Sequence, residues 1–329
     1  MTSWKRPLLV THTNPDGDAL GSLVAVRSLL RSRGVDALAL LFAPLANRYR
    51  MFARYGPMPV FGTDVNASDL STVDGVVLLD TCAYSQLRPI ADWLRTAKKP
   101  KIAVDHHVTR DDMADLYVID ESAAANCLIL HDWVRAADWP LDAKTRDALF
   151  IGIAMDTGWF RHSNTDRRVL EAAADLVAQG VCPHELYRQL FLQESTGRIR
   201  LLGAALNAME LLVDGRLALL TLRADSFTQA GAVPTDTEDI VNEPLRIGSV
   251  AVSVLLVERG DGVVRASFRS KPPIDEGSLD VDVAAVAQAF GGGGHRRAAA
   301  ARVTGAFSTT RQAIVDHLSK LLRCGGAAI

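Results

Sequence analysis

The sequence predicts an α/β protein with two parts: an N-terminal domain built on a parallel sheet and a smaller α/β C-terminal domain. In the first two hundred residues, short apolar runs alternate with longer segments of helical spacing, which is typical of a parallel sheet covered by helices. Further on, the apolar runs become richer in β-branched residues and follow one another more closely. A chain of 329 residues is also long for a single core.

The N-terminal elements follow from these patterns in order. A helix is expected to begin after the first strand, because Leu20, Leu23 and Val24 recur at helical spacing and Gly34 follows as a stop signal. The expected strands are residues 7–11, 35–42, 75–79 and 101–104, and the expected helices are residues 19–33, 122–136, 143–154 and 166–179.

The C-terminal elements begin after a long helical pattern over residues 186–212, which has few turn signals except near Gly197. Strands are expected at residues 216–223, 250–258 and 263–269, and helices at residues 281–290 and 309–322. We therefore expect an N-terminal domain over residues 1–190, a helical linker over 191–214 and a C-terminal domain over 215–329.

Composition excludes several classes of protein. The formal net charge is −2, whereas proteins that bind long nucleic acid usually carry a basic excess, so a small substrate or a local basic pocket is favoured. The four cysteines are scattered, which argues against a zinc ribbon or a disulfide framework and favours a cytoplasmic protein. Neither a signal peptide nor a membrane-spanning segment is expected.

Carboxylates and imidazoles follow the apolar runs. His12, Asp16 and Asp18 lie in the turn after the first strand, although Asp18 before Ala19 is also a reasonable helix cap. Asp80 ends the run of residues 76–79, where an aspartate can equally cap a helix or bind a ligand. Together with the first segment, Asp80 is better interpreted as a carboxylate that bridges two metal ions.

Two further segments carry the same signal. Asp105, His106 and His107 follow a buried strand, so the two histidines are expected to point in opposite directions, one toward a metal and one toward substrate. Asp105 can accept a hydrogen bond from an imidazole and fix its tautomer. Asp156 follows an apolar run, with a helix cap as the alternative interpretation.

These segments together supply four aspartates and two histidines as metal ligands: His12, Asp16, Asp18, Asp80, His106 and Asp156. Ligands of mixed oxygen and nitrogen type favour Mn²⁺ or another transition ion over Mg²⁺. Two divalent ions are typical of enzymes that hydrolyse phosphate esters.

A glycine-rich segment, residues 291–294, comes just before His295, Arg296 and Arg297. Glycines allow the backbone to approach a ligand closely, so Gly293, Gly294 and His295 are candidate substrate-binding residues, with a flexible turn as the alternative. Arg269 ends an expected strand and can join this basic pocket, although a single arginine is more often a solvated surface charge.

At this point the motifs resemble those of the DHH phosphoesterase superfamily. The resemblance covers residues 12–22, Asp80, residues 105–107 and residues 156–160, and the segment ending at His295 resembles the signature of the DHH-associated C-terminal domain. Within the superfamily the chain is most similar to short oligoribonucleases, or nanoRNases, that also act as phosphatases of 3′-phosphoadenosine-5′-phosphate (pAp). One departure is Ala300, where the family pattern has a glycine.

The resemblance implies that residues 1–190 form the catalytic domain, that residues 215–329 form the substrate-binding domain and that the active cleft lies between them. It also implies a role for each candidate residue. One Mn²⁺ is expected on His12, Asp16 and Asp80, and the other on Asp18, Asp80, His106 and Asp156. His107, supported by Asp105, is expected to contact the scissile phosphate. Arg269 and His295 are expected to hold the far end of a short RNA, a dinucleotide or pAp, and the resemblance also makes a homodimer plausible.

The alternatives are a phosphodiesterase of cyclic or linear signalling dinucleotides, a manganese inorganic pyrophosphatase and a non-catalytic nucleotide sensor. The segment ending at His295 argues against the pyrophosphatase, and the complete ligand set argues against the sensor.

Overall fold

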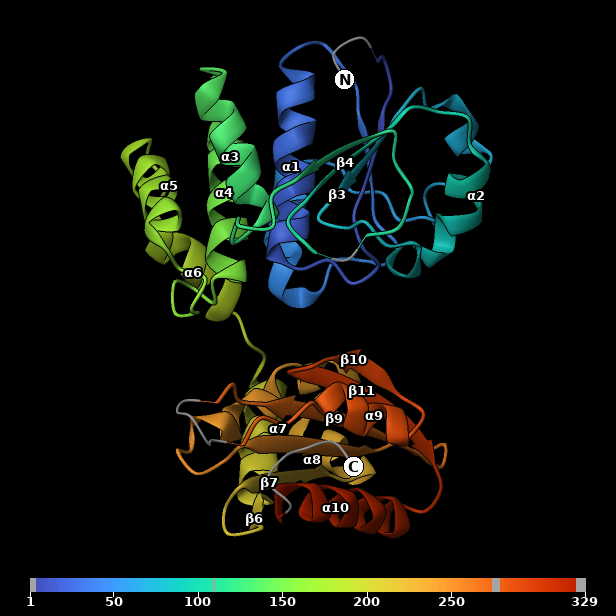
Figure 1. Ribbon diagram of the computed structural model, residues 1–329, viewed down its shortest axis with the longest axis vertical. Coiled ribbons are helices and arrows are strands. Elements are labelled where there is room, and N and C mark those ends of the chain that lie inside the picture. Colours follow the sequence, from blue (N-terminus) through green and yellow to red (C-terminus); the bar gives the residue numbers. More distant parts are fainter. Residues whose placement is uncertain (1–3, 109, 274–278, 324–329) are drawn as a thin grey trace. The chain divides into compact units, whose positions relative to one another are not determined.

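The computed structural model describes residues 4–108, 110–273 and 279–323, which divide into two compact units that meet in the chain between Gln193 and Glu194 (Figure 1). The first unit is built on a parallel sheet and the second on a mixed sheet, so the expected α/β class is confirmed. In the described part of the chain, no helix is long and apolar enough to span a membrane.

The sheet of the first unit has five parallel strands in the order β2-β1-β3-β4-β5. The strands are β1 (Leu8–Val10), β2 (Leu38–Leu40), β3 (Val76–Leu79), β4 (Lys101–Asp105) and β5 (Leu116–Ile119). Four of them were predicted. The fifth, β5, lies at the sheet edge and is only partly buried, so it lacks the continuous apolar run that marks the others.

Helices cover both faces of this sheet (Figure 1). They are α1 (Gly17–Arg31), α2 (Ala91–Thr96), α3 (Asn126–Ala136), α4 (Ala143–Asp156), α5 (Arg167–Ala178) and α6 (Pro183–Phe191). Alternate strand residues face opposite sides: Leu9 and Val77 pack in one core, which includes residues of α1, α3 and α4. Leu8 and Val76 pack in a second core. The parallel sheet is thus buried on both sides, as the uninterrupted apolar strands predict.

The sheet of the second unit has six strands in the order β10-β11-β9-β8-β7-β6. Its strands are β6 (Glu210–Leu212), β7 (Leu217–Leu222), β8 (Val252–Glu258), β9 (Val263–Ser270), β10 (Gly293–His295) and β11 (Ala298–Thr304). The helices are α7 (Thr196–Asn207), α8 (Ala224–Ala230), α9 (Val283–Ala289) and α10 (Phe307–Arg323). Only β7 and β8 pair in parallel among the described strands of this sheet.

The prediction of a helical linker over residues 191–214 is wrong at its C-terminal end, which is not helical. The helical pattern breaks between α6 and α7, α7 ends at Asn207, and Glu210–Leu212 forms the edge strand β6. Leu201 and Ala205 of α7 are buried in a core with Leu220 and Leu255, so α7 packs on the sheet of the second unit. The sequence pattern could not separate a packed helix from a connector.

Candidate metal centre

Three strand ends of the first unit carry the site. The register pairs Val10 with Leu78 and Leu78 with Ala103 across β1, β3 and β4. His12, Asp80 and Asp105 each lie two residues beyond that row, so they leave the sheet side by side at its carboxyl edge.

The ligand atoms fall into two groups of the kind predicted. His12, Asp16 and Asp80 offer atoms that all lie within 4.8 Å of one another, and Asp18, His106 and Asp156 form a second such group. Asp80 and His106 also form a group with Asp105 and His107. The structure therefore brings all six predicted metal ligands together, from segments that span residues 12 to 156.

The turn before α1 separates two carboxylates. Asp16 is the N-cap of α1, since its Oδ1 accepts hydrogen bonds from the backbone N–H groups of Asp18 (3.0 Å) and Ala19 (3.1 Å). The alternative that Asp18 caps the helix is therefore wrong. Asp18 lies in the first turn of α1 and is fully buried.

Asp18 is held by the start of another helix. Its carboxylate accepts hydrogen bonds from the backbone N–H groups of Asn126 and Cys127, the latter at 2.8 Å, at the N-terminus of α3. A helix N-terminus favours a negative charge. Burial, together with the neighbouring Asp80 and Asp16, nevertheless raises the pKa of Asp18 to about 7.

Asp80 lies between the two groups of ligands. Its backbone is left-handed, with φ of 57°, a conformation that aspartate tolerates better than most residues. The side chain is buried, with Oδ2 3.7 Å from Nε2 of His12 and Oδ1 3.3 Å from Nε2 of His106. One carboxylate thus faces an imidazole on either side.

His106 points its ring into the carboxylates. Nδ1 lies 3.1 Å from the carbonyl oxygen of Ala123, so Nδ1 is the donor and the Nε2 lone pair of a neutral ring faces inward. That Nε2 lies 3.3 Å from Oδ1 of Asp80, 3.3 Å from Oδ2 of Asp156 and 3.9 Å from Oδ2 of Asp18.

Unlike the mostly buried His106, His107 is half-exposed. Its Nδ1 lies 2.7 Å from Oδ1 of Asp105, an oxygen that also accepts the backbone N–H of His106 at 2.8 Å. The hydrogen bond to Asp105 raises the pKa of His107 and fixes the ring, with burial opposing. The second ring nitrogen is left to meet a ligand, which suits an anionic group.

Unpartnered atoms show that this cluster fits metal ions. Oδ1 of Asp80 and Nε2 of His106 are buried without a hydrogen-bond partner among the described residues. Burial and the neighbouring carboxylates raise the pKa of Asp156 to about 9, which reflects repulsion within the cluster. Cations relieve that repulsion and satisfy both orphaned atoms. Mixed oxygen and imidazole donors fit a divalent transition ion better than Mg²⁺.

The predicted residues of the second unit also lie together. His295 pairs with Ala298 across β10 and β11, and Ala298 pairs with Arg269 across β11 and β9. Directly opposed residues share a face of the sheet, so His295 and Arg269 flank Ala298 at roughly 9–10 Å, two strand spacings. The small Ala298 leaves room between them.

The glycine segment is part of the sheet rather than a loose turn. Gly293 and Gly294 belong to the edge strand β10, and Gly294 has φ of 148°. A Cβ at Gly294 would lie 2.5 Å from the carbonyl oxygen of Ala298, so only glycine fits there. Ala300, which departs from the family pattern, is an ordinary strand residue paired with Gly293 and tolerates its methyl group.

Several supporting groups could not be identified from the sequence. The amides that hold Asp18 come from residues more than a hundred positions away, and the acceptor for His106 is the backbone carbonyl of Ala123. Gly152 is a third supporting residue. A Cβ there would lie 2.3 Å from Sγ of Cys127 and 2.7 Å from Oδ1 of Asp18, so the packing around Asp18 requires glycine at this position. A glycine inside the helical pattern of α4 was the one available signal.

Comparison with known proteins agrees with this architecture. Residues 7–153 match the DHH family, N-terminal domain, and residues 216–323 match the DHHA1 domain. The chain is 29% identical over 319 residues to the "Bifunctional oligoribonuclease and PAP phosphatase NrnA" of Thermus thermophilus, covering 95% of this chain and 90% of that protein. It is 25% identical to the Bacillus subtilis protein of the same name, covering 90% of this chain and 88% of the other.

Among solved structures, the fold is similar to that of an exopolyphosphatase-related protein from Bacteroides fragilis. The TM-score is 0.79 at 22% identity, and the match covers 97% of this chain and 94% of the other. Both units therefore have counterparts in a protein of known structure.

Proposed function

Because the chain belongs to the DHH family and carries a DHHA1 domain after its DHH domain, we propose that it hydrolyses short oligoribonucleotides and pAp with the help of divalent metal ions. The observation that carries this proposal is the pair of ligand groups around Asp80. The names of the relatives from Thermus thermophilus and Bacillus subtilis support the choice of substrates.

The side chains of the first unit have separate proposed roles in binding the metal ions and the phosphate. His12, Asp16 and Asp80 are suited to one ion, and Asp18, His106 and Asp156 to the other, with Asp80 shared. Two divalent ions, when bound, lower the pKa of water and neutralise charge on a phosphoryl group. His107, oriented by Asp105 and with a raised pKa, donates a hydrogen bond to a phosphate oxygen.

The second unit is proposed to bind the rest of the substrate. Arg269 offers a planar fork of donors that matches phosphate, and His295 lies on the same face of the sheet. Gly293 and Gly294 let the backbone approach a ligand closely at this edge. The proposed metal ligands and these residues come from different units, so hydrolysis and substrate binding can be tested separately.

The test is an assay of purified protein on pAp, dinucleotides, longer RNA, cyclic dinucleotides and pyrophosphate. Chelator should abolish hydrolysis, and Mn²⁺ should restore more activity than Mg²⁺, because imidazole ligands favour the transition ion. Full hydrolysis in excess chelator would refute the metal-dependent reaction. A clear preference for cyclic dinucleotides or pyrophosphate would refute the proposed substrates.

A further inference from the structure

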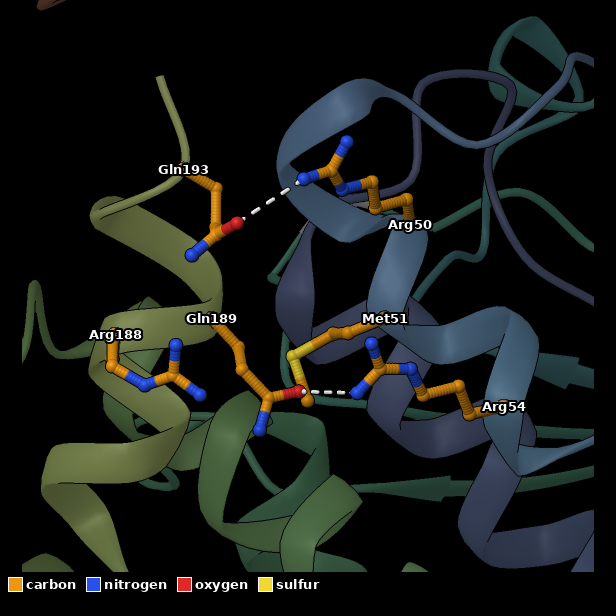
Figure 2. A pocket seen from close by; sticks show the side chains of 6 residues that line it. All are labelled: Arg50, Met51, Arg54, Arg188, Gln189 and Gln193. Carbon is orange, nitrogen blue, oxygen red and sulfur yellow. Dashed lines mark hydrogen bonds between the residues drawn. The ribbon is translucent and has the colours of Figure 1, made fainter. Parts of the chain in front are cut away.

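A second polar site lies in the first unit, outside the metal centre. A pocket of about 250 Å³ opens between α6 and the 3₁₀ helix η1 (Asn47–Tyr55). It is lined by Arg50, Met51, Arg54, Arg188, Gln189 and Gln193, and these residues define what we call the arginine pocket. Figure 2 shows Arg50 and Arg54 reaching from η1 toward the glutamines on the other side.

The arginine pocket has an excess of positive charge. NH2 of Arg50 donates to Oε1 of Gln193 and NH1 of Arg54 donates to Oε1 of Gln189, both at 3.2 Å. These acceptors are neutral, and no carboxylate of the described residues forms an ion pair with either guanidinium. Arg188 is paired with Glu185 on its own helix. Three arginines and one glutamate leave two uncompensated positive charges.

The donors of this pocket are mostly free. A guanidinium has five N–H groups, and Arg50 and Arg54 each use one in the bonds described above. Met51 also lines the pocket, and its buried thioether is only a weak competing acceptor. Such an arrangement favours an oxyanion with several acceptor oxygens, and phosphate matches the guanidinium fork.

Contacts within the first unit orient this pocket relative to the metal centre. Trp159, three residues after Asp156, stacks edge-on against Tyr187 and Phe191 of α6, with ring centroids 5.3 and 5.4 Å away. At the opposite end of η1, the hydroxyl of Tyr55 donates to Asp147 at 3.3 Å, near the start of α4. The metal ligand Asp156 is the last residue of that helix.

Near the start of η1, the guanidinium of Arg48 lies 5.4 Å from the ring centroid of Phe191, the residue that packs on Trp159. Because the other end of η1 lies beside Asp147, η1 runs from the side of Trp159 toward the start of α4. Arg50, which pairs with Gln193, lies at the end of the pocket nearer the metal centre, and Arg54, which pairs with Gln189, lies farther off. Four residues of a 3₁₀ helix rise about 8 Å, so the two guanidinium groups form a short row of positive charge that leads away from the metal-binding edge.

We propose that the arginine pocket binds backbone phosphates of the part of an oligoribonucleotide that is not being cleaved. This inference rests on the proposed hydrolysis of short RNA. A substrate as small as pAp has no chain to extend into the pocket, so its hydrolysis does not depend on these arginines. A longer RNA reaches Arg50 first and Arg54 only after further nucleotides.

The experiment compares wild-type protein with the double variant Arg50→Gln, Arg54→Gln. The matched control is Arg95→Gln, Arg167→Gln, which removes the same charge from two exposed arginines of the first unit that pair within their own helices. Binding of labelled RNAs of increasing length is measured in chelator, so that no hydrolysis occurs. Thermal unfolding of all three proteins shows whether the fold is intact.

The pocket variant should bind RNA of about five or more nucleotides roughly tenfold more weakly, and the slope of log K against log salt should fall by about 1.4 for two lost contacts to a single strand. The control variant should bind like wild type, and pAp should bind all three proteins alike. The two single variants should lose RNA affinity at different lengths: Arg50→Gln should weaken the binding of shorter RNA than Arg54→Gln does.

Two results would overturn the inference: equal RNA affinity of the pocket and control variants, or displacement of RNA by an acidic peptide as effectively as by unlabelled RNA. Hydrolysis is scored separately. If wild type cleaves RNA while the pocket variant binds it normally, the inference fails and the proposed function stands. If wild type cleaves neither RNA nor pAp with any divalent ion, the proposed function fails, whatever the binding data show.

Discussion

His106 and Asp80 face each other in the candidate metal centre, with Nε2 of the imidazole 3.3 Å from Oδ1 of the carboxylate, and neither atom has a hydrogen-bond partner among the described residues. An unsatisfied buried polar group costs about 1–3 kcal/mol, and more when it is charged. The hydrogen bond between Nδ1 of His106 and Ala123 keeps the ring in this orientation. The fold thus holds both side chains in place, and a cation bound between them would satisfy both inward-facing atoms.

Asp80→Asn should remove most of the turnover. The amide keeps the size of the side chain and tolerates the left-handed backbone, but it loses the charge that faces both ligand groups. We expect a fall in kcat of at least about 100-fold, measured with pAp and Mn²⁺. Asp138→Asn is the matched control, because Asp138 is also left-handed (φ 47°) but exposed. Near wild-type turnover of Asp80→Asn would refute its shared role.

Gly152→Ala should disturb Asp18 through packing. The new methyl group would meet Sγ of Cys127 and Oδ1 of Asp18, so the usual gain from alanine in a helix is reversed. We expect the free energy of unfolding to fall by about 1–3 kcal/mol and Mn²⁺ to bind more weakly. Gly203→Ala in α7 is the control, since a Cβ there would meet no packed neighbour within 4 Å among the described residues. Equal stability and Mn²⁺ affinity of the two variants would contradict this account.

The metal-free protein should lose stability as pH rises. Burial and neighbouring carboxylates raise the pKa of Asp18 to about 7 and of Asp156 to about 9, both above the ordinary 3.8. Burial opposes charge on His106, but the carboxylates outweigh it and raise its pKa to about 10. At pH values between the unfolded and the folded pKa of each group, the folded protein binds more protons than the unfolded chain does. Its free energy of unfolding therefore falls as the pH rises.

Metal ions replace those protons, so the stabilisation that Mn²⁺ gives should be larger at about pH 8 than at about pH 6. Thermal unfolding with chelator and with Mn²⁺ at both pH values measures this. The opposite order, or a shift that does not depend on pH, would mean that protons and ions do not compete at this cluster.

Arg269→Ala and His295→Ala should weaken substrate binding without affecting the hydrolysis step itself. Each charge-assisted hydrogen bond to phosphate contributes roughly 1.5–3 kcal/mol, so hydrolysis of pAp or a dinucleotide should fall by about 10- to 100-fold. A small artificial phosphodiester needs only the first unit and should be hydrolysed almost normally. Arg246→Ala, which removes an exposed arginine of the second unit, is the control. Equal losses on both substrates would contradict the proposed division.

Much of the candidate metal centre could be predicted, because its side chains follow buried apolar runs. His12, Asp80 and Asp105 leave three parallel strands at one edge, and that geometry follows from strand order alone. Strand β11 could not be predicted, because its first four residues are alanines, which favour helices. It is a strand because β9 and β10 pair with it on both sides.

The arginine pocket could not be predicted for a different reason. Arg50 and Gln193 lie 143 positions apart, and η1 is a 3₁₀ helix without the apolar spacing of an α-helix. From the net charge, the sequence indicated only a small substrate or a local basic pocket. Where that surface lies depends on how α6 packs against η1, which is a property of the tertiary fold.

The position of Ala298 has a consequence for how such an enzyme can change during evolution. Ala299 and Ala301 are packed in the core, but Ala298 lies on the opposite face, between His295 and Arg269. A single substitution at Ala298 can therefore narrow or alter that space without disturbing the core or any metal ligand. If His295 and Arg269 bind substrate as proposed, changes at that one codon alter substrate preference in descendants of this protein while the residues of the first unit stay the same.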